Sequence, residues 1–179
     1  MTCFEMVRSG DLEALKEYIA DGGDISGKDE SGNTLITVAA LTGNKAIVTF
    51  LRERGAKPDF FTELALGSVP RITACLASGG CTANSVDSRG FHPLMVVASQ
   101  GHADAAKLLI ERGAAVNARH AISGNTALME AATGGHDEIV RLLLDKGADR
   151  SIKNLSGKDA AALAANASVA ALIRDYRRR

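Results

Sequence analysis

The sequence of 179 residues is poor in aromatic side chains, which make up 4% of it, and it contains no tryptophan. A core must therefore be built mainly from Leu, Ile, Val and Ala, which suits thin layers of packed elements. Neither sign of charge is in excess, because 21 Lys and Arg residues face 21 Asp and Glu residues. A net charge of zero gives no overall attraction to nucleic acid or to membranes.

Cysteine is also rare, with Cys3, Cys75 and Cys81 as the three examples. An odd count without a CxxC or Cys/His ligand spacing predicts neither a disulfide framework nor a zinc site. No apolar run approaches the roughly eighteen residues of a transmembrane helix, and the N-terminal residues lack the order of a signal peptide. We therefore expect a cytoplasmic protein, with the nucleus as an alternative, and no membrane partner.

Signatures of catalysis are missing as well. No serine lies in a G-x-S-x-G context, which would predict a nucleophile. The regularly placed glycines are spaced 11 and 12 residues apart, whereas a phosphate-binding loop needs them within one turn. We expect no catalytic residue, no metal and no cofactor, and we expect that the protein is not an enzyme.

Glycine is abundant, and its spacing is regular. Between the glycines lie two short helical patterns, such as Leu128, Ala131 and Ala132 followed by Ile139, Val140 and Leu143. Glycines twelve residues apart recur five times, at Gly10 and Gly22, Gly43 and Gly55, Gly67 and Gly79, Gly101 and Gly113, and Gly135 and Gly147. The step between pairs is 33 or 34 residues, except for 24 from Gly43 to Gly67. This period predicts a stacked array of helical repeats.

One stretch of the sequence, DSRGFHPLMVVASQGHADAAKLLIERGAAVN at residues 87–117, resembles the repeat of the ankyrin family. That pattern has a G-x-T-P-L-H turn, an A-A helix, a G-H turn and an L-L-x-x-G-A-D end. The turns at 32–35 and 124–127 keep the Gly and Thr but lose the proline, and His92 replaces the Thr at 90–93. The resemblance covers essentially the whole chain and implies an all-α ankyrin-repeat solenoid.

We expect a single domain, residues 1–179, made of about six helix-turn-helix units. Their approximate ranges are 1–28, 29–57, 58–86, 87–120, 121–153 and 154–179. The first and last units should act as caps, because a terminal repeat lacks one neighbour. The third unit is shortened and has no room for its turn, so Pro58 and Asp59 should lead directly into the inner helix. In the last unit we expect an inner helix over Ala160–Ala165.

Each of the two turns that precede Gly90 and Gly124 carries one extra residue. The distances from Gly79 to Gly90 and from Gly113 to Gly124 are eleven residues rather than ten. Because hairpin tips are exposed and tolerate insertion, we expect both extra residues to lie at tips.

The resemblance implies a protein-binding surface on a concave face, made of turns and inner helices. The residues of this chain at the matching positions and beside them are Glu30, Ser31, Asn33, Ser88, Arg89, Phe91, Ser99, Gln100, Arg119, His120, Ile122, Ser123, Asn125 and Thr133. Phe91, Arg89 and Ile122 stand out, because aromatic and arginine side chains supply much of the energy at interfaces. Alternatively, Phe91 packs against the next turn, and His120 is a solvated loop residue.

Other conspicuous side chains have a structural explanation beside a functional one. The resemblance implies that His102 and His136 hydrogen-bond turn backbone, and His92 is expected to cap a helix in place of Thr. Phe60 and Phe61, in the shortened unit, are either core residues, which we favour, or an exposed aromatic anchor.

The leading functional prediction is a non-catalytic, monomeric module that binds a partner protein or peptide. A narrower form is an inhibitor or immunity-type protein that blocks a partner's active site. The alternative class is nucleic-acid binding through Lys153, Lys158, Arg174 and the basic residues 177–179. Zero net charge and the lack of interleaved aromatic residues count against that alternative, so nucleic acid is not the expected partner.

Overall fold

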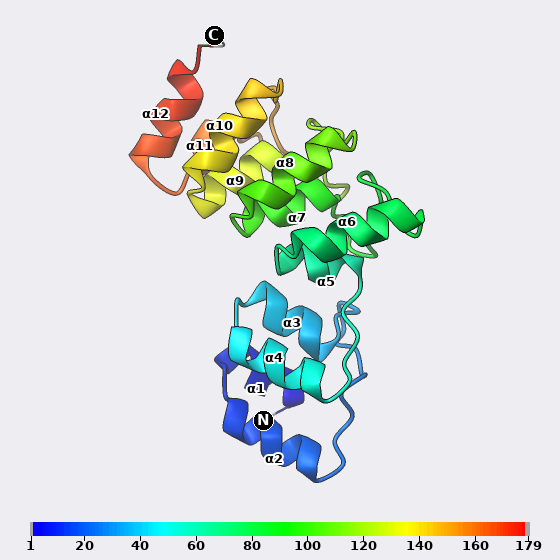
Figure 1. Cartoon of the computed structure of the whole chain (residues 1–179). Coiled ribbons are helices and arrows are strands. Elements are labelled where there is room, and N and C mark those ends of the chain that lie inside the picture. The colour runs from blue at the N-terminus through cyan, green and yellow to red at the C-terminus, as the bar shows by residue number, and fades with distance from the viewer. Residues whose placement is uncertain (1, 178–179) are drawn as a thin grey trace. The chain divides into compact units, whose positions relative to one another are not determined.

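The computed structural model describes residues 2–177, and within them the regular secondary structure is helical apart from one isolated bridge between Lys28 and Thr34. The predicted all-α class is confirmed. The helices follow one another in pairs (Figure 1). They are α1 (Cys3–Ser9), α2 (Leu12–Ala20), α3 (Leu35–Leu41), α4 (Lys45–Glu53), α5 (Phe60–Ala65), α6 (Val69–Ser78), α7 (Pro93–Ser99), α8 (Ala103–Glu111), α9 (Ala127–Gly134), α10 (Asp137–Asp145), α11 (Ala160–Leu163) and α12 (Ala167–Asp175).

The chain divides into two compact units, Met1–Leu66 and Gly67–Arg179. The division falls between α5 and α6, inside the third predicted repeat. The first unit therefore holds α1 to α5, and the second holds α6 to α12. A single domain over residues 1–179 and the six repeat ranges remain predictions.

In the first unit the inner helices lie side by side in the order α1, α3, α5. The outer helix α2 packs against α1, and the outer helix α4 packs against α3. Apolar side chains such as Leu15, Leu35 and Leu64 are fully buried between them. Polar contacts also join neighbouring helices. The hydroxyl oxygens of Thr37 and Thr62 lie 2.8 Å apart, inside the unit.

The shortened repeat begins its inner helix as predicted. Asp59 is the N-cap of α5, and its carboxylate accepts a hydrogen bond of 2.7 Å from the Thr62 N–H. The rings of Phe60 and Phe61, at the start of this helix, meet edge to face with their centroids 5.6 Å apart. Both residues are half-buried, so each ring is covered in part by the other.

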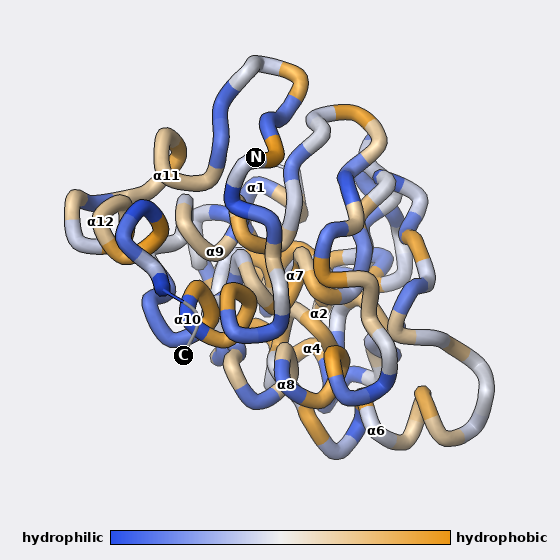
Figure 2. Tube along the Cα trace, turned by 90° about the horizontal axis from the view of Figure 1, so that it is seen from above, coloured by the Kyte–Doolittle hydropathy of each residue, from blue (hydrophilic) through white to orange (hydrophobic). Residues whose placement is uncertain are grey.

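In the second unit α7, α9 and α11 are adjacent, and α6, α8, α10 and α12 pack beside one another or behind them. Figure 2 shows hydrophobic stretches along the helices and more hydrophilic ones in the loops between them. Leu109, Leu128 and Leu143 are among the buried core residues. Pro70 lies in the first turn of α6, as predicted, where a missing N–H costs no helical hydrogen bond.

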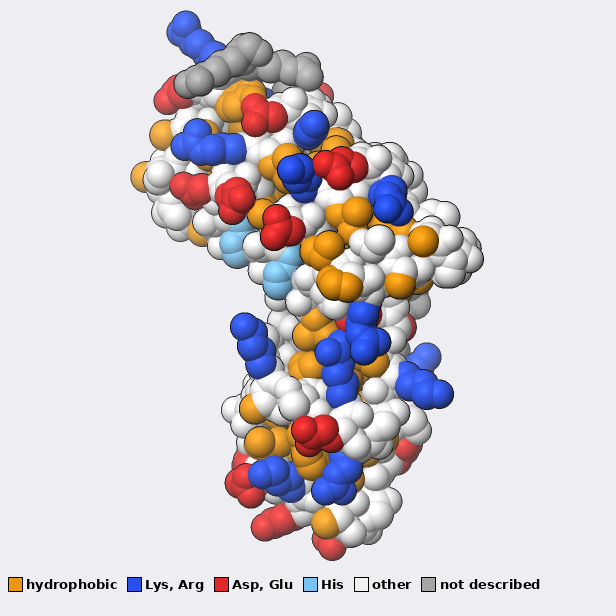
Figure 3. Space-filling view, in the orientation of Figure 1, with side chains coloured by type: hydrophobic (Ala, Val, Ile, Leu, Met, Phe, Trp, Pro, Cys, Tyr) orange, Lys and Arg blue, Asp and Glu red, His pale blue; other side chains and the backbone are white. Residues whose placement is uncertain are grey.

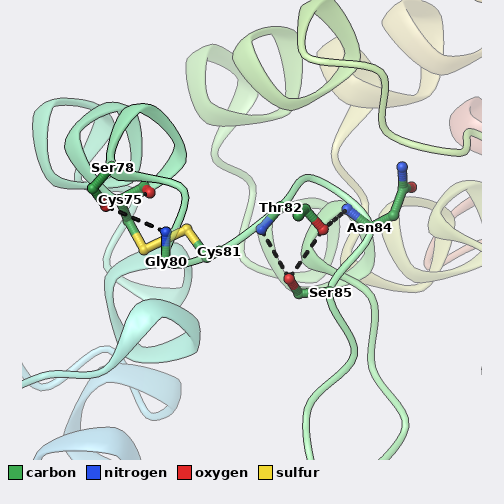
Figure 4. The surroundings of a disulfide bond; sticks show 7 residues. All are labelled: Cys75, Ser78, Gly80, Cys81, Thr82, Asn84 and Ser85. Carbon is green, nitrogen blue, oxygen red and sulfur yellow. Dashed lines mark hydrogen bonds between the residues drawn. A yellow bond between two sulfur atoms is a disulfide. The ribbon is translucent and has the colours of Figure 1, made fainter.

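A disulfide is present, although the number and spacing of the cysteines indicated no disulfide framework. Cys75, in α6, is bonded to Cys81, six residues further on, with the two Cα atoms 5.8 Å apart (Figure 4). Gly79 ends α6 in the left-handed conformation, with φ of 74°. This glycine turns the chain back, so Cys81 returns to the last turn of the helix that carries Cys75.

The inner helix of the last unit is shorter than the predicted Ala160–Ala165. It ends at Leu163, and the backbone of Ala164 is extended, with ψ of 134°. The Ala165 N–H donates a hydrogen bond of 2.8 Å to the Ala132 carbonyl of α9. The backbone thus leaves the helix to bond to the neighbouring repeat.

Candidate functional site

The candidate surface starts from hairpin tips that are built alike. In the tip at 29–33 the Asp29 N–H donates to the Asn33 carbonyl at 2.9 Å. The Asp29 carboxylate accepts from the N–H groups of Ser31 and Asn33, at 3.0 and 2.9 Å. Asp87 and Asn154 make the same contacts in their own tips. A short polar side chain at the first position of the tip therefore accepts the hydrogen bonds of the backbone N–H groups in the turn.

The two extra residues before Gly90 and Gly124 lie at different places. The tip at 120–125 is longer by one residue, because His120 N–H bonds to the Asn125 carbonyl at 2.8 Å, as predicted. The tip at 87–91 has the same length as the tip at 29–33. Its extra residue lies upstream, in the loop 79–86 that follows α6, so the expectation of an insertion at that tip is wrong.

His120 has a scaffold role, so the alternative of a solvated loop residue is wrong, whereas partner contact by His120 stays a prediction. It is 7% exposed. Its Nδ1 accepts a hydrogen bond of 3.2 Å from the Ser123 N–H and lies 2.8 Å from the Ser123 hydroxyl. Because Nδ1 accepts, Nε2 carries the proton and donates to the Arg89 carbonyl at 2.9 Å. His120 thus replaces the carboxylate or carboxamide of the other tips, and it also links two hairpins.

Phe91 and Arg89 belong to the same link. The Phe91 ring stacks on the His120 imidazole with centroids 4.3 Å apart, which is the packing against the next turn that was the alternative for Phe91. The Arg89 guanidinium lies 5.3 Å from the centre of the Phe91 ring and 2.7 Å from the Asp87 carboxylate. Both residues are half-buried, and any partner contact by them is a proposal.

The remaining predicted residues differ in exposure. Six predicted positions are exposed, namely Glu30, Ser31, Ser88, Arg119, Ile122 and Thr133. Five are half-buried, namely Asn33, Ser99, Gln100, Ser123 and Asn125. Some already serve the scaffold: Arg119 donates to the Lys153 carbonyl at 2.9 Å, and the Asn125 carboxamide bonds to Glu130 and Asn154, each at 2.9 Å.

Two hairpin tips present large apolar side chains to solvent. Ile122 is 75% exposed and Leu155 is 70% exposed. The Leu155 N–H donates to the Ser123 carbonyl at 2.9 Å, so Leu155 lies beside the tip that carries Ile122. Leu155 was not predicted. The sequence feature that could have indicated it is an apolar residue at the tip position that Ser88 occupies in another repeat.

The first unit has a hollow of about 410 Å³ between α1 and the hairpin tip. It brings together the predicted Glu30 and Ser31 with Phe4 and Arg8, which the sequence did not indicate because α1 was treated only as a cap. Arg8 pairs with Asp29 at 2.8 Å. Burial raises the pKa of Asp29, but hydrogen bonds from Asn33 and Ser31 and the charge of Arg8 outweigh burial and lower that pKa below its ordinary value.

His136, which follows a turn glycine, supports the scaffold. His136 Nε2 lies 3.0 Å from the Ser99 carbonyl, so this imidazole bonds to the preceding inner helix, and the structural prediction is confirmed. A Cβ on Gly101 would lie 2.8 Å from the same ring, which explains the glycine. His92 is at the N-cap of α7 but makes no capping bond, so that expectation is wrong. The N–H of Met95, three residues on, donates instead to the His92 backbone carbonyl at 3.0 Å.

The alternative nucleic-acid surface is only partly described. Lys153, Lys158 and Arg174 are exposed, whereas residues 178–179 of the basic end lie outside the described residues. On the face in Figure 3, acidic and basic side chains are interspersed in each unit. Among residues 2–177 no helix is long and apolar enough to cross a membrane, and no three His, Cys, Asp or Glu side chains cluster as metal ligands.

A family model for ankyrin repeats, in three copies, matches residues 64–154, about half of the chain. Stacked helix pairs with glycine-tipped hairpins agree with that match. The chain belongs to the ankyrin repeat family, whose repeats generally act as protein–protein interaction modules. Among curated proteins, Protein VAPYRIN-LIKE from Medicago truncatula is 29% identical over 119 residues, which cover 62% of this chain. The chain spans about a quarter (26%) of that relative's length.

Proposed function

We propose that this chain is a non-catalytic module that binds a partner protein or peptide through its hairpin tips and inner helices. The observation that carries the proposal is the pair of exposed apolar side chains, Ile122 and Leu155, on adjacent tips. Neither fills the core of this chain, and both lie where ankyrin-like proteins commonly bind others. Polar predicted residues such as Ser88 and Thr133 would form the rim of this surface.

The energetic contribution of the two apolar tips can be bounded. Burying one exposed Leu or Ile side chain is worth about 2 kcal/mol. Removing both should therefore weaken a complex by about one to three orders of magnitude, since 1.4 kcal/mol is tenfold. Side chains with this effect are the hot spots of an interface.

The test is an affinity capture from cells of the source organism, with captured proteins identified by mass spectrometry. The bait is the full chain, either unchanged or as the double variant Ile122→Ser and Leu155→Ser. A partner retained by the unchanged chain and lost with the double variant supports the proposal. A matched control is Lys146→Ser, an exposed substitution away from the tips.

Recovery of the same partner with the double variant and the unchanged chain would contradict this surface. If the captured protein is an enzyme and the chain reduces its activity, the narrower inhibitor interpretation applies. Recovery of nucleic acid in place of protein would instead favour the basic C-terminal end.

We further propose a cytoplasmic, monomeric protein without enzymatic activity. The balanced charge and the lack of catalytic motifs support this. The Cys75–Cys81 pair tests the location, because a reducing compartment keeps most such pairs as thiols. Labelling of these cysteines by a thiol reagent directly after cell lysis would agree with a cytoplasmic location, and full protection would contradict it.

A further inference from the structure

Two asparagines in the second unit join successive repeats in the same way. The Asn84 amino group donates to the Gly113 carbonyl at 2.9 Å, and its carboxamide oxygen accepts from the Ala115 N–H at 2.7 Å. Asn117 makes the matching pair, to the Gly147 carbonyl at 3.2 Å and from Asp149 N–H at 2.8 Å. A carboxamide fits because it offers a donor and an acceptor side by side.

The first unit has the receiving backbone but lacks the asparagine. Gly55 and Lys57 correspond to Gly113 and Ala115, and position 26, four residues after Gly22, corresponds to Asn117. Serine occupies this position, and its hydroxyl bonds to the Asp24 carboxylate at 2.6 Å. Among the described residues nothing hydrogen-bonds to the Gly55 carbonyl or the Lys57 N–H.

A hollow of about 360 Å³ lies at this place. Ser26, Gly55 and Lys57 line it together with the apolar side chains of Ile25 and Ile36. The missing hairpin of the third repeat explains why it is open. In the other repeats the chain continues from this point into a hairpin, whereas here it turns at Pro58 into α5. The hollow therefore combines an apolar wall with one free backbone donor and one free backbone acceptor.

We propose that this hollow is a binding site for the side-chain carboxamide of an asparagine in an extended peptide segment of a partner. The carboxamide oxygen accepts from the Lys57 N–H, and its amino group donates to the Gly55 carbonyl. A small aliphatic neighbour of the asparagine packs against Ile25 and Ile36. The chain's own segments Ala83-Asn84 and Val116-Asn117 show this pairing of residue types at the filled positions.

The inference concerns the first unit and does not depend on the proposed surface around Ile122 and Leu155. It names a different ligand chemistry, a neutral amide in place of an apolar contact. A site of two neutral hydrogen bonds and a small apolar contact should bind a short peptide with a dissociation constant in the millimolar range.

The probe is a capped peptide with the sequence of residues 115–118, Ala-Val-Asn-Ala, blocked as an N-methylamide so that asparagine supplies the one primary amide. It is titrated into the isotopically labelled full chain, and backbone amide resonances are followed by NMR. We expect the Lys57 amide to shift in a saturable manner. The matched peptide with leucine in place of asparagine should leave that amide in place.

Two variants separate filling of the site from general effects. Ser26→Asn should supply the carboxamide from within, shift the Lys57 amide without any peptide, and reduce the peptide response at least tenfold. Ser26→Ala leaves the hollow open, so the peptide should bind as to the unchanged chain. Each variant's amide spectrum also reports whether it is folded.

Three outcomes would overturn the proposal. They are no peptide-dependent shift at Lys57, an equal shift with the leucine peptide, and undiminished binding to folded Ser26→Asn. An equal response to the leucine peptide would identify a purely apolar hollow. Loss of partner capture by the Ile122 and Leu155 variant would not affect any of these results, so the two proposals can fail separately.

Discussion

Replacing His120 by alanine should destabilise the second unit by about 3 kcal/mol. The change removes the bond from Nε2 to the Arg89 carbonyl and the bond that Nδ1 accepts from the Ser123 N–H. Each is worth about 1 kcal/mol net. It also removes the stack on the Phe91 ring, at a centroid distance of 4.3 Å, which adds about 1 kcal/mol.

The assay is equilibrium urea denaturation followed by circular dichroism, with amide hydrogen exchange to locate the loss. Exchange should accelerate first at Ser123 and Gly124, whose N–H groups bond within this tip. His120→Asn is an informative second variant, because Asn154 satisfies the turn of another tip. Asparagine should recover the bond within the tip but neither the link to Arg89 nor the stack on Phe91, and so cost about two thirds as much as alanine.

Exposed Lys146→Ala serves as the control and should change the free energy of unfolding by no more than about 0.5 kcal/mol. If His120→Ala costs no more than that control, His120 does not hold the hairpins together. The same result would favour partner contact as the role of His120.

Three further perturbations test other parts of the scaffold. Reduction of the Cys75–Cys81 bond should lower the free energy of unfolding by about 2 kcal/mol, because the bond closes a short loop. The melting temperature should therefore fall when a reductant is added, and the reductant should have no effect on the variant in which both cysteines are replaced by serine. Since the pKa of Asp29 is lowered, its ionised form stabilises the folded state above the ordinary pKa of 3.8, and this stabilisation is lost as the pH falls through the lowered folded value. Acid unfolding should therefore be less steep for Asp29→Asn, and an unchanged profile would contradict the assignment. Arg52→Met should lower the free energy of unfolding by about 2 kcal/mol in urea denaturation, because it removes the 3.0 Å ion pair of buried Glu63. The Arg52 side chain is 36% exposed, so the loss should be smaller than for a fully buried pair. No loss would show that Glu63 is stabilised by other contacts.

The fold was predictable because the same helix starts, turn glycines and apolar positions recur from repeat to repeat. Asp59 was predicted as a helix start and is an N-cap that accepts from the backbone three residues on, as Thr34 does in the preceding repeat. The glycine spacing located the loops, and the step of 24 residues located the missing hairpin. Periodicity could not indicate the Cys75–Cys81 bond, which depends on one left-handed glycine bringing position 81 back to its own helix.

The candidate site was less predictable, because exposure at a hairpin tip depends on what the next hairpin does. Position alone suggested that His120 and Phe91 face a partner, but a longer tip lets His120 bond to the preceding hairpin and cover Phe91. Leu155 was overlooked for the opposite reason. It lies in a repeat treated as a cap, although its tip is built like the others.

Departures from the repeat are the places where binding chemistry can arise in such an array. A regular repeat satisfies its backbone groups through its neighbours, as Asn84 and Asn117 do between loops. Losing one hairpin does not separate the inner helices, because the hydroxyl pair of Thr37 and Thr62 still joins α3 to α5 directly. It does leave the hollow at Gly55 open, and serine in place of asparagine at position 26 leaves the Gly55 carbonyl without the hydrogen bond that the Gly113 and Gly147 carbonyls accept. The packing of the helices therefore tolerates the loss of a hairpin, and the backbone groups that no neighbouring repeat hydrogen-bonds become available to another molecule.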